Sequence, residues 1–202
     1  MALSEIKLIS GPSVELSLAT VKSYMRIAYS EDDALITLLI QSARERCEHW
    51  CNRKFITQTW EAYYDKIDKR FELPCAPIQN VTAFNLIYLS ETVALTQNSD
   101  YYVMGSFDKF IILTATTYNL PPGFSLGDDL WRFNVQVQFT CGYGNDYTTV
   151  PAGIQEAIMK TVASNYDLRA DVQGISRTGI NGFIELPNDA KSLLKPYKNV
   201  TI

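Results

Sequence analysis

The chain has 202 residues, of which 47% are hydrophobic, 12% aromatic and 20% charged. This composition excludes a wholly disordered or collagen-like chain, and a protein of this length can fold without a disulfide or a metal. With 18 Lys and Arg residues against 22 Asp and Glu residues, the formal net charge is −4. A surface that wraps nucleic acid is therefore not expected.

No membrane span is predicted, because no run approaches the roughly 20 apolar residues that a transmembrane helix needs. Residues 1–10 contain one Lys and no long apolar stretch, so no secretory signal peptide is predicted either. We therefore expect a reducing cytoplasm as the compartment of synthesis, with the 4 cysteines as free thiols.

Two helices are predicted first. Ser17 can cap a short helix over 17–26, where apolar residues recur at helical spacing. Ser30 and the acidic residues after it predict the start of a longer helix over 31–52, since acids in the first turn interact well with the helix dipole. Its predicted apolar stripe consists of Leu35, Ile36, Leu39, Ile40, Ala43, Cys47 and Trp50.

The pattern then changes to the two-residue alternation of strands. It predicts strands over 56–64 and 78–89, a hairpin formed by 101–104 and 109–113, and a final strand over 131–140. Residues 119–129, rich in Pro and Gly, are predicted as a loop.

Helical spacing returns after Pro151, which suits the first turn of a helix over 151–169. Residues 170–188 show no period, and a short helix over 190–195 is predicted to end before Pro196. The last residues, 197–202, are expected to be extended.

Because helices and strands are segregated along the chain, the predicted fold class is α+β. We expect a small helical bundle, made of residues 1–54 and 150–202 with a C-terminal tail, that carries an inserted antiparallel β-domain over 55–149. The residues predicted to form the helical core are Leu35, Leu39, Ala43, Ile154, Ile158 and Val162.

The cysteines do not predict a metal site. Cys47 and Cys51 are four residues apart on the long helix, but His49 points to the other side, so the three cannot converge on one ion. Cys75 and Cys141 have no ligand-like spacing. These thiols are interpreted as small core residues.

No motif predicts catalysis or a cofactor. The run Cys141-Gly142-Tyr143-Gly144 lacks the third glycine of a dinucleotide-binding loop and is interpreted as a turn after a strand. Neither a nucleophile elbow nor a phosphate-binding loop is present. The basic residues are scattered along the chain and are interpreted as solvated. We therefore predict no enzyme, no cofactor and no metal.

Several short segments, taken in order, resemble the head–tail connector family of tailed bacteriophages, also called adaptor or head-completion proteins. The resemblance covers most of the chain and is weakest over 85–113. It rests on the segments Leu18–Ile27, Glu31–Ile36, Leu39-Ile40, Ala43-Arg44, Cys47-Glu48, Arg53–Trp60, Leu73-Pro74, Pro77–Val81, Cys141–Gly144, Val150-Pro151, Tyr166–Arg169 and Leu193–Tyr197.

The resemblance implies a structural virion protein without catalysis. Such proteins form a ring, commonly of twelve copies, beneath the portal, join the DNA-filled head to a stopper or tail-completion protein, and extend the DNA channel. The implied location is the virion neck, after assembly in the host cytoplasm. The alternatives are a tail-terminator or stopper protein, a nucleic-acid-binding module, and an enzyme that uses Cys141 or Cys75.

The C-terminal tail is the predicted portal contact. It follows Pro196 without a helical period and carries an aromatic and β-branched residues, which suit an interface. The resemblance implies the same role for the tail. The candidate portal-binding residues are Tyr197, Lys198, Val200, Thr201 and Ile202.

Overall fold

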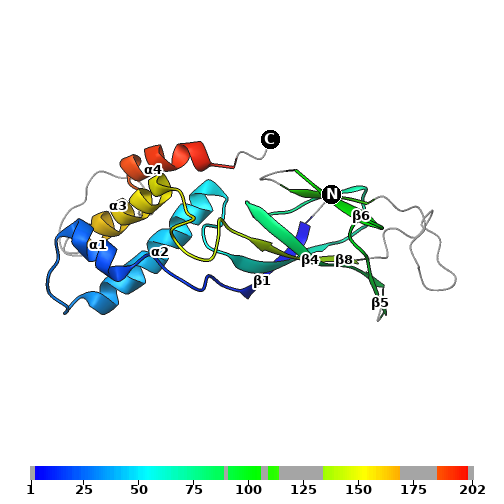
Figure 1. Cartoon of the computed structure of the whole chain (residues 1–202), viewed down its shortest axis with the longest axis horizontal. Helices are drawn as coiled ribbons and strands as arrows, with labels where there is room; N and C mark the ends of the chain where they lie inside the picture. Colours follow the sequence, from blue (N-terminus) through cyan, green and yellow to red (C-terminus); the bar gives the residue numbers. More distant parts are fainter. Residues whose placement is uncertain (1–2, 89–90, 106–108, 114–133, 169–185, 200–202) are drawn as a thin grey trace, which may run out of the picture. The chain divides into compact units, whose positions relative to one another are not determined.

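The computed structural model describes residues 3–88, 91–105, 109–113, 134–168 and 186–199 (Figure 1). The chain divides into two compact units. We call Met1–Ser13 with Ile56–Tyr143 the β unit, and Val14–Phe55 with Gly144–Ile202 the helical unit.

The described residues of the β unit form two antiparallel sheets. The first has five strands in the order β1-β2-β8-β4-β5, and the second has three strands in the order β3-β7-β6. The strands are β1 (Leu3–Ser10), β2 (Gln58–Tyr64), β3 (Arg70–Glu72), β4 (Ile78–Tyr88), β5 (Glu91–Ala94), β6 (Tyr101–Met104), β7 (Phe110–Leu113) and β8 (Asn134–Cys141).

Strand β8 lies between β2 and β4 and shows the alternation that its sequence predicts. Val135, Val137 and Phe139 are fully buried, while the residues between them are partly exposed. In the register, Phe139 stands opposite Trp60 of β2 and Val81 of β4. Apolar side chains of three strands thus share one face of the sheet, which forms one wall of the core.

Aromatic rings join the two sheets. Phe71 of the small sheet makes edge-to-face contacts with Tyr64 and Phe84 of the large sheet, with ring centroids 5.1 and 5.4 Å apart. Phe84 makes a third such contact with Tyr101, at 5.0 Å. The Tyr64 hydroxyl donates to the carbonyl oxygen of Glu72 at 2.6 Å. The two sheets therefore pack against each other through aromatic side chains. The rings meet edge to face, which is the arrangement that aromatic quadrupoles favour.

The helical unit contains α1 (Leu18–Met25), α2 (Asp33–Cys51), α3 (Ala152–Leu168), α4 (Asn188–Leu194) and the 3₁₀ turn η3 (Lys195–Tyr197). Helix α3 packs against α2, α4 and α1, and it lies between α2 and α4 (Figure 1). Arg26 and Asn52, which end α1 and α2, adopt the left-handed conformation typical of a helix C-terminus.

The centre of the helical core is formed by side chains from α2 and α3. Ala43, Ile154, Ile158 and Val162 are fully buried. Leu35 and Leu39 are only half-buried, whereas Ile36 and Ile40 are buried on α2. A shift of one residue rotates a side chain by about 100° around the helix axis, so the leucines lie at the side of the stripe and the isoleucines at its centre.

The α+β class, the four helices and the main strands agree with the sequence-based prediction. The prediction was wrong at the N-terminus, where residues 3–10 form β1 and place residues 1–13 in the β unit instead of the helical core. All eight residues of β1 are exposed, so the strand has no buried face whose alternation could reveal it. Strands β3 and β5, of three and four residues, were also missed.

The segment after α4 also differs from the prediction. Tyr197 ends the turn η3, so the extended conformation expected from residue 197 onward is wrong there. Pro196 has no backbone N–H and therefore cannot continue the α-helix. It fits the first turn of the 3₁₀ helix, where that N–H would have no partner within the helix. The predicted loop over 119–129 and residues 170–185 lie outside the described part of the chain.

Candidate functional site

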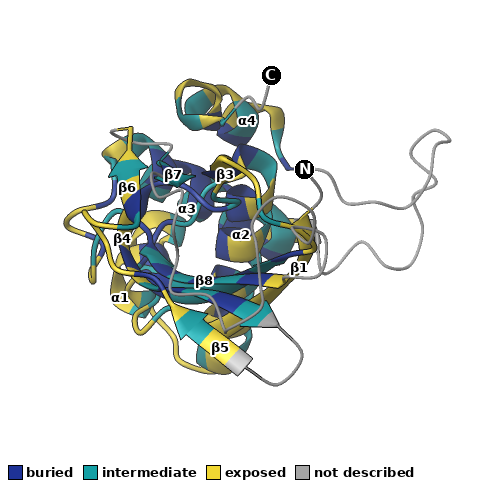
Figure 2. Ribbon diagram, turned by 90° about the vertical axis from the view of Figure 1, so that its right-hand side faces the viewer, coloured by how far each residue is buried: buried dark blue, intermediate teal, exposed yellow. Residues whose placement is uncertain are grey.

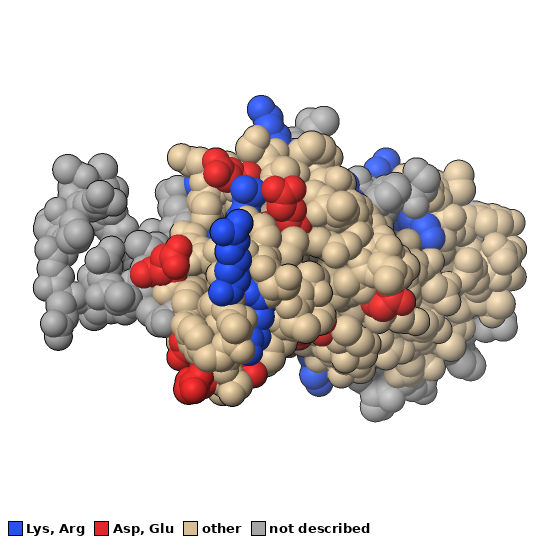
Figure 3. All heavy atoms as spheres, turned by 60° about the vertical axis from the view of Figure 1, so that its left-hand side comes forward, with Lys and Arg blue, Asp and Glu red and all other residues tan. Residues whose placement is uncertain are grey.

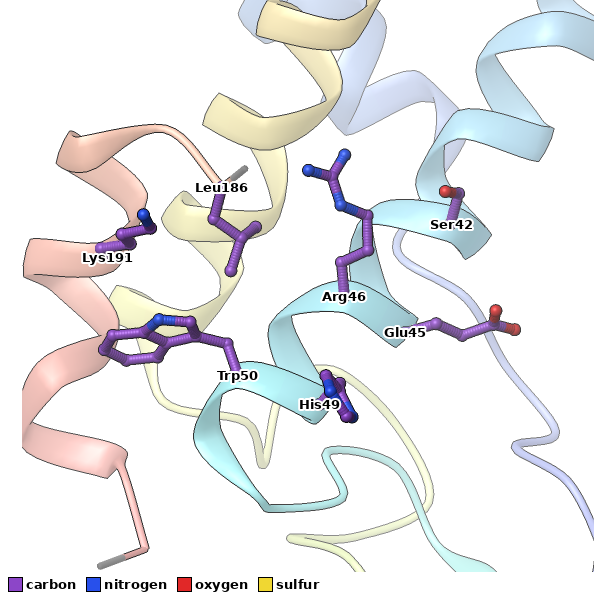
Figure 4. A pocket seen from close by; sticks show the side chains of 7 residues that line it. All are labelled: Ser42, Glu45, Arg46, His49, Trp50, Leu186 and Lys191. Carbon is purple, nitrogen blue, oxygen red and sulfur yellow. The ribbon is translucent and has the colours of Figure 1, made fainter. Parts of the chain in front are cut away.

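A cavity of about 550 Å³ lies in the helical unit, between α2 and the α4 region. Figure 4 shows Trp50 and Arg46 of α2 reaching toward Leu186 and Lys191, while Glu45 points away from them. The lining residues are Ser42, Glu45, Arg46, His49, Trp50, Leu186 and Lys191.

The amphipathic character of α2 positions this cavity. One side of the helix, which includes Ile40 and Cys47, is buried in the core. The opposite side presents Ser42, Arg46 and His49 to the cavity. The cavity thus offers cationic groups, an imidazole and an indole, which suit an acidic or aromatic group of a binding partner.

The C-terminal segment is fastened to the helical unit by three interactions. Arg53 donates from Nε to the Tyr197 carbonyl oxygen at 2.5 Å, and the Asn199 amide donates to the Cys51 carbonyl oxygen at 2.8 Å. The Lys198 ammonium lies 4.7 Å from the centre of the Trp50 ring, within the range of a cation–π interaction. The end of α2 therefore holds residues 197–199 in place.

Tyr197 also packs closely on α3. A Cβ atom added at Gly153 would lie 3.3 Å from both Cε2 and Oη of Tyr197, so the ring rests on a position with no side chain. Tyr197 is partly buried and Lys198 is exposed. Tyr197, predicted as a portal contact, therefore packs within its own subunit.

A buried ionic network organises the same unit on the other side of α2. Arg44 donates from Nε to Glu15 at 2.9 Å and from Nη1 to Glu48 at 3.0 Å. Glu48 also accepts the Phe55 amide at 2.9 Å and lies 3.6 Å from the Lys54 ammonium. The side chains of Arg44 and Glu48 are only 4% and 1% exposed. These contacts connect Glu15, which precedes α1, and Phe55, which follows α2, to the buried pair of Arg44 and Glu48.

Burial also controls ionisation in this unit. Loss of hydration raises the pKa of Cys47 to about 11 and that of Cys51 to about 12. Partial burial raises the pKa of Glu15, and this effect outweighs the stabilising charge of Arg44. The Arg44 guanidinium loses hydration too, but the neighbouring carboxylates of Glu48 and Glu15 raise its pKa overall. The two thiols are therefore neutral and inert, the opposite of an activated nucleophile.

The cysteines and the histidine lie as the sequence predicted, on different sides of α2. Cys47 and Cys51 are buried free thiols, and His49 is exposed at the cavity. Cys75 and Cys141 are buried free thiols in the core of the β unit. Among the described residues, no group of three or more His, Cys, Asp or Glu side chains could hold a metal ion.

The structure brings together only part of the predicted portal-binding set. Lys198 lies beside the cavity's Trp50 and Tyr197 packs on α3, whereas Val200, Thr201 and Ile202 lie outside the described residues. Sequence reasoning missed the cavity, because it assigned Trp50 to the buried stripe. The spacing of Arg46, His49 and Trp50 at i, i+3 and i+4 was the available signal of a shared face.

None of the helices in the described ranges is long and apolar enough to cross a membrane. The sequence matches no curated protein.

Three solved structures resemble this fold over nearly the whole chain. The neck of an empty gene transfer agent particle, computed with C6 symmetry, has a TM-score of 0.71 at 16% identity, covering 98% of this chain and 97% of the other. A chain of the native gene transfer agent virion has the same score and identity, with coverages of 98% and 96%. The neck of the native particle, computed with C12 symmetry, has a TM-score of 0.65 at 17% identity and covers 97% of both chains.

A sequence profile gives the stronger assignment. The profile described as "Head completion protein" matches residues 16–200, which include all the helices and, apart from β1, all the strands that the structure describes. The resemblance noted in the sequence is thereby confirmed, and the chain belongs to the head completion protein family.

Proposed function

We propose that this chain is a structural protein of a head–tail neck, in which copies form a ring beneath the portal and extend the DNA channel. The observation that carries the proposal is the family match over residues 16–200. Ring assembly with twelve copies is supported by the likeness to a chain from a neck of C12 symmetry. The proposed partners are other copies of the chain, the portal, and a stopper or tail-completion protein.

The proposed channel must let DNA slide without tight binding. On the face shown in Figure 3, a short stripe of Lys and Arg is flanked by Asp and Glu, and most of the surface is uncharged. The net charge of −4 agrees with a lumen that is neutral or acidic, or that has only sparse basic contacts. DNA would pass through the ring without sequence-specific recognition.

The proposed portal contact is the end of the tail. Residues 197–199 are held by α2 and α3, and in this proposal they would anchor the end of the tail to the helical unit. Beyond them, Val200, Thr201 and Ile202 would supply the apolar contacts to the portal. A short segment binds weakly by itself, and simultaneous contact by many copies in a ring would compensate for this.

The proposal is tested by removing the gene and imaging the particles by cryo-electron microscopy. We expect DNA-filled heads without attached tails, and recovery of joined particles when the gene is restored. In the restored particles, density for the chain should form a ring at the neck. Normal yields of joined, tailed particles without the protein would contradict the proposal.

A further inference from the structure

Exposed apolar side chains of the β unit are concentrated on two strands. Among the described residues of this unit, every large hydrophobic side chain that is clearly exposed lies on β1 or β6. Each has between 37% and 47% of its surface accessible: Leu3, Ile6, Leu8 and Ile9 on β1, and Tyr102 and Met104 on β6.

Both strands are at the edge of a sheet. Strand β1 is the first strand of the five-stranded sheet and pairs with β2, and β6 is the last strand of the three-stranded sheet and pairs with β7. Natural proteins usually cover or charge such edges, because a long apolar edge invites pairing with another chain. Here β1 exposes apolar residues on both of its faces, so no packing within the β unit covers them.

The charges of the two strands allow them to meet. Strand β6 carries no charged residue. Strand β1 carries one residue of each sign, Glu5 and Lys7, and Lys7 already stands opposite Glu61 of β2. Each strand is therefore neutral overall, and a contact between them brings no like charges together.

The two strands also lie on different sides of the same unit. Figure 2 shows β1 and β6 at opposite sides of the β unit, with β3, β7 and β8 between them. A contact between two different surfaces on opposite sides of a subunit is heterologous, and repeating it around an axis closes a ring. A contact of β1 with itself would instead stop at a dimer and leave β6 uncovered.

From this arrangement we propose that β1 of one copy covers β6 of the next copy in the ring. This inference rests on the proposed function, because it needs a ring. The eight residues of β1 exceed the four of β6, so one strand is long enough to cover both Tyr102 and Met104. Burying these apolar side chains between subunits supplies the association free energy.

Cysteine cross-linking in assembled particles tests this contact. The variant L8C/Y102C places one thiol on each strand, as does the variant I6C/M104C, and the two pairs fit one antiparallel register. After mild oxidation we expect a ladder of disulfide-linked oligomers that extends beyond the dimer on a non-reducing gel. Ladders from I6C/Y102C and L8C/M104C instead would indicate a parallel register and also support the contact.

The chain provides its own controls. Its four native cysteines are buried, so the parent protein should give no ladder. The single variant L8C should give no cross-link either, whereas dimers from L8C alone would show that β1 meets β1 and would overturn the inference. Particles that contain the double variants but give no ladder with any of the four pairs would overturn it as well.

Charge substitution gives a second test that needs no cross-link. I6D/L8D should leave the chain folded, because both sites are exposed, but should remove it from particles. The matched control is Leu38→Asp, an exposed apolar site on α2 that lies outside β1, and this variant should be incorporated normally. Incorporation of I6D/L8D at the parental level would contradict the inference. Absence of the parent protein from particles would instead contradict the proposed neck function.

Discussion

Among single residues, Gly142 shows how closely two backbone segments approach. Its φ angle of +129° is rarely adopted by other residues, and an added Cβ would lie 2.6 Å from the carbonyl carbon and oxygen of Ile56. Its amide donates to the Pro77 carbonyl oxygen at 2.8 Å, so the backbone is held where it is. Gly142→Ala should lower the free energy of unfolding by about 2 kcal/mol or more, measured by urea denaturation.

Gly11→Ala is the matched control. An added Cβ at Gly11 meets only the Leu8 Cδ2 atom, at 3.9 Å, which is ordinary van der Waals contact. Its effect should stay within about 0.5 kcal/mol. Equal effects of the two substitutions would show that the close approach at Gly142 is unimportant.

A second prediction concerns the buried carboxylate of Glu48. Glu48→Ala would remove the buried acceptor of Arg44 Nη1 and of the Phe55 amide, and would leave Arg44 with only the more exposed Glu15 and Glu45. Breaking one side of a buried ion pair typically costs about 3–5 kcal/mol, which urea denaturation can measure. Glu45→Ala removes a neighbouring partner of Arg44 whose side chain is 57% exposed, and it should cost less than about 1 kcal/mol. A similarly small cost for Glu48→Ala would show that the network contributes little.

A third prediction follows from the neutral thiols. The folded-state pKa values of Cys47 and Cys51 are raised to about 11 and about 12, above the ordinary value of 9.0. When the pKa of a thiol is higher in the folded state than in the unfolded state, its contribution to stability is fully present at pH values below the unfolded-state pKa. This contribution is lost as pH rises from the unfolded-state pKa through the folded-state pKa. We expect stability to fall as pH rises above about 9, measured as the urea midpoint.

The control is the variant C47A/C51A, which should lose stability less steeply over the same alkaline range. The burial of Tyr64 and Tyr147 raises the pKa of both phenols, so part of the decline should remain. At neutral pH, a thiol reagent should label the parent protein only as fast as the protein unfolds. Rapid labelling of the folded protein would contradict the neutral, buried state of these thiols.

Among the helices and strands, the contact of α2 with α3 should dominate the stability of the helical unit. Ile158 is fully buried on α3, and Ile158→Ala should cost about 2–5 kcal/mol. Leu39 is only half-buried on α2, so Leu39→Ala should cost distinctly less. Thermal and urea unfolding of the two variants measure both values, and equal costs would contradict the observed phase of α2.

The strands illustrate why some elements are visible in a sequence and others are not. Strand β8 has one buried face, so its alternation of apolar and polar residues is clear from the amino-acid order alone. Strand β1 has no buried face, and its conformation depends on pairing with β2, more than forty residues away. Edge strands that bury nothing within their own subunit are the elements that pattern recognition misses.

For the molecule as a whole, truncation can separate the tail residues anchored on the helical unit, 197–199, from residues 200–202. Removing 200–202 should leave the unfolding free energy within about 0.5 kcal/mol of the parent, because the anchoring contacts of Tyr197 and Asn199 remain. Attachment to portal-bearing heads should nevertheless weaken, which a sedimentation assay with purified heads can measure.

A longer truncation serves as the comparison. Removing 197–202 also deletes the ring that rests on Gly153 and the acceptor of Arg53, so it should lower stability as well as attachment. Unchanged attachment after the short truncation would show that residues 200–202 are not the portal contact.

The α+β class, the four helices, the alternation of β8 and the family could all be predicted from the amino-acid order, because they depend on local periodicity and on the succession of short segments. Which side chains share a surface emerged only from the folded chain. Folding placed β1 in the β unit, Trp50 at a cavity instead of in the core, and Tyr197 on α3. Each of these depends on contacts between residues far apart in the chain, which local pattern does not encode.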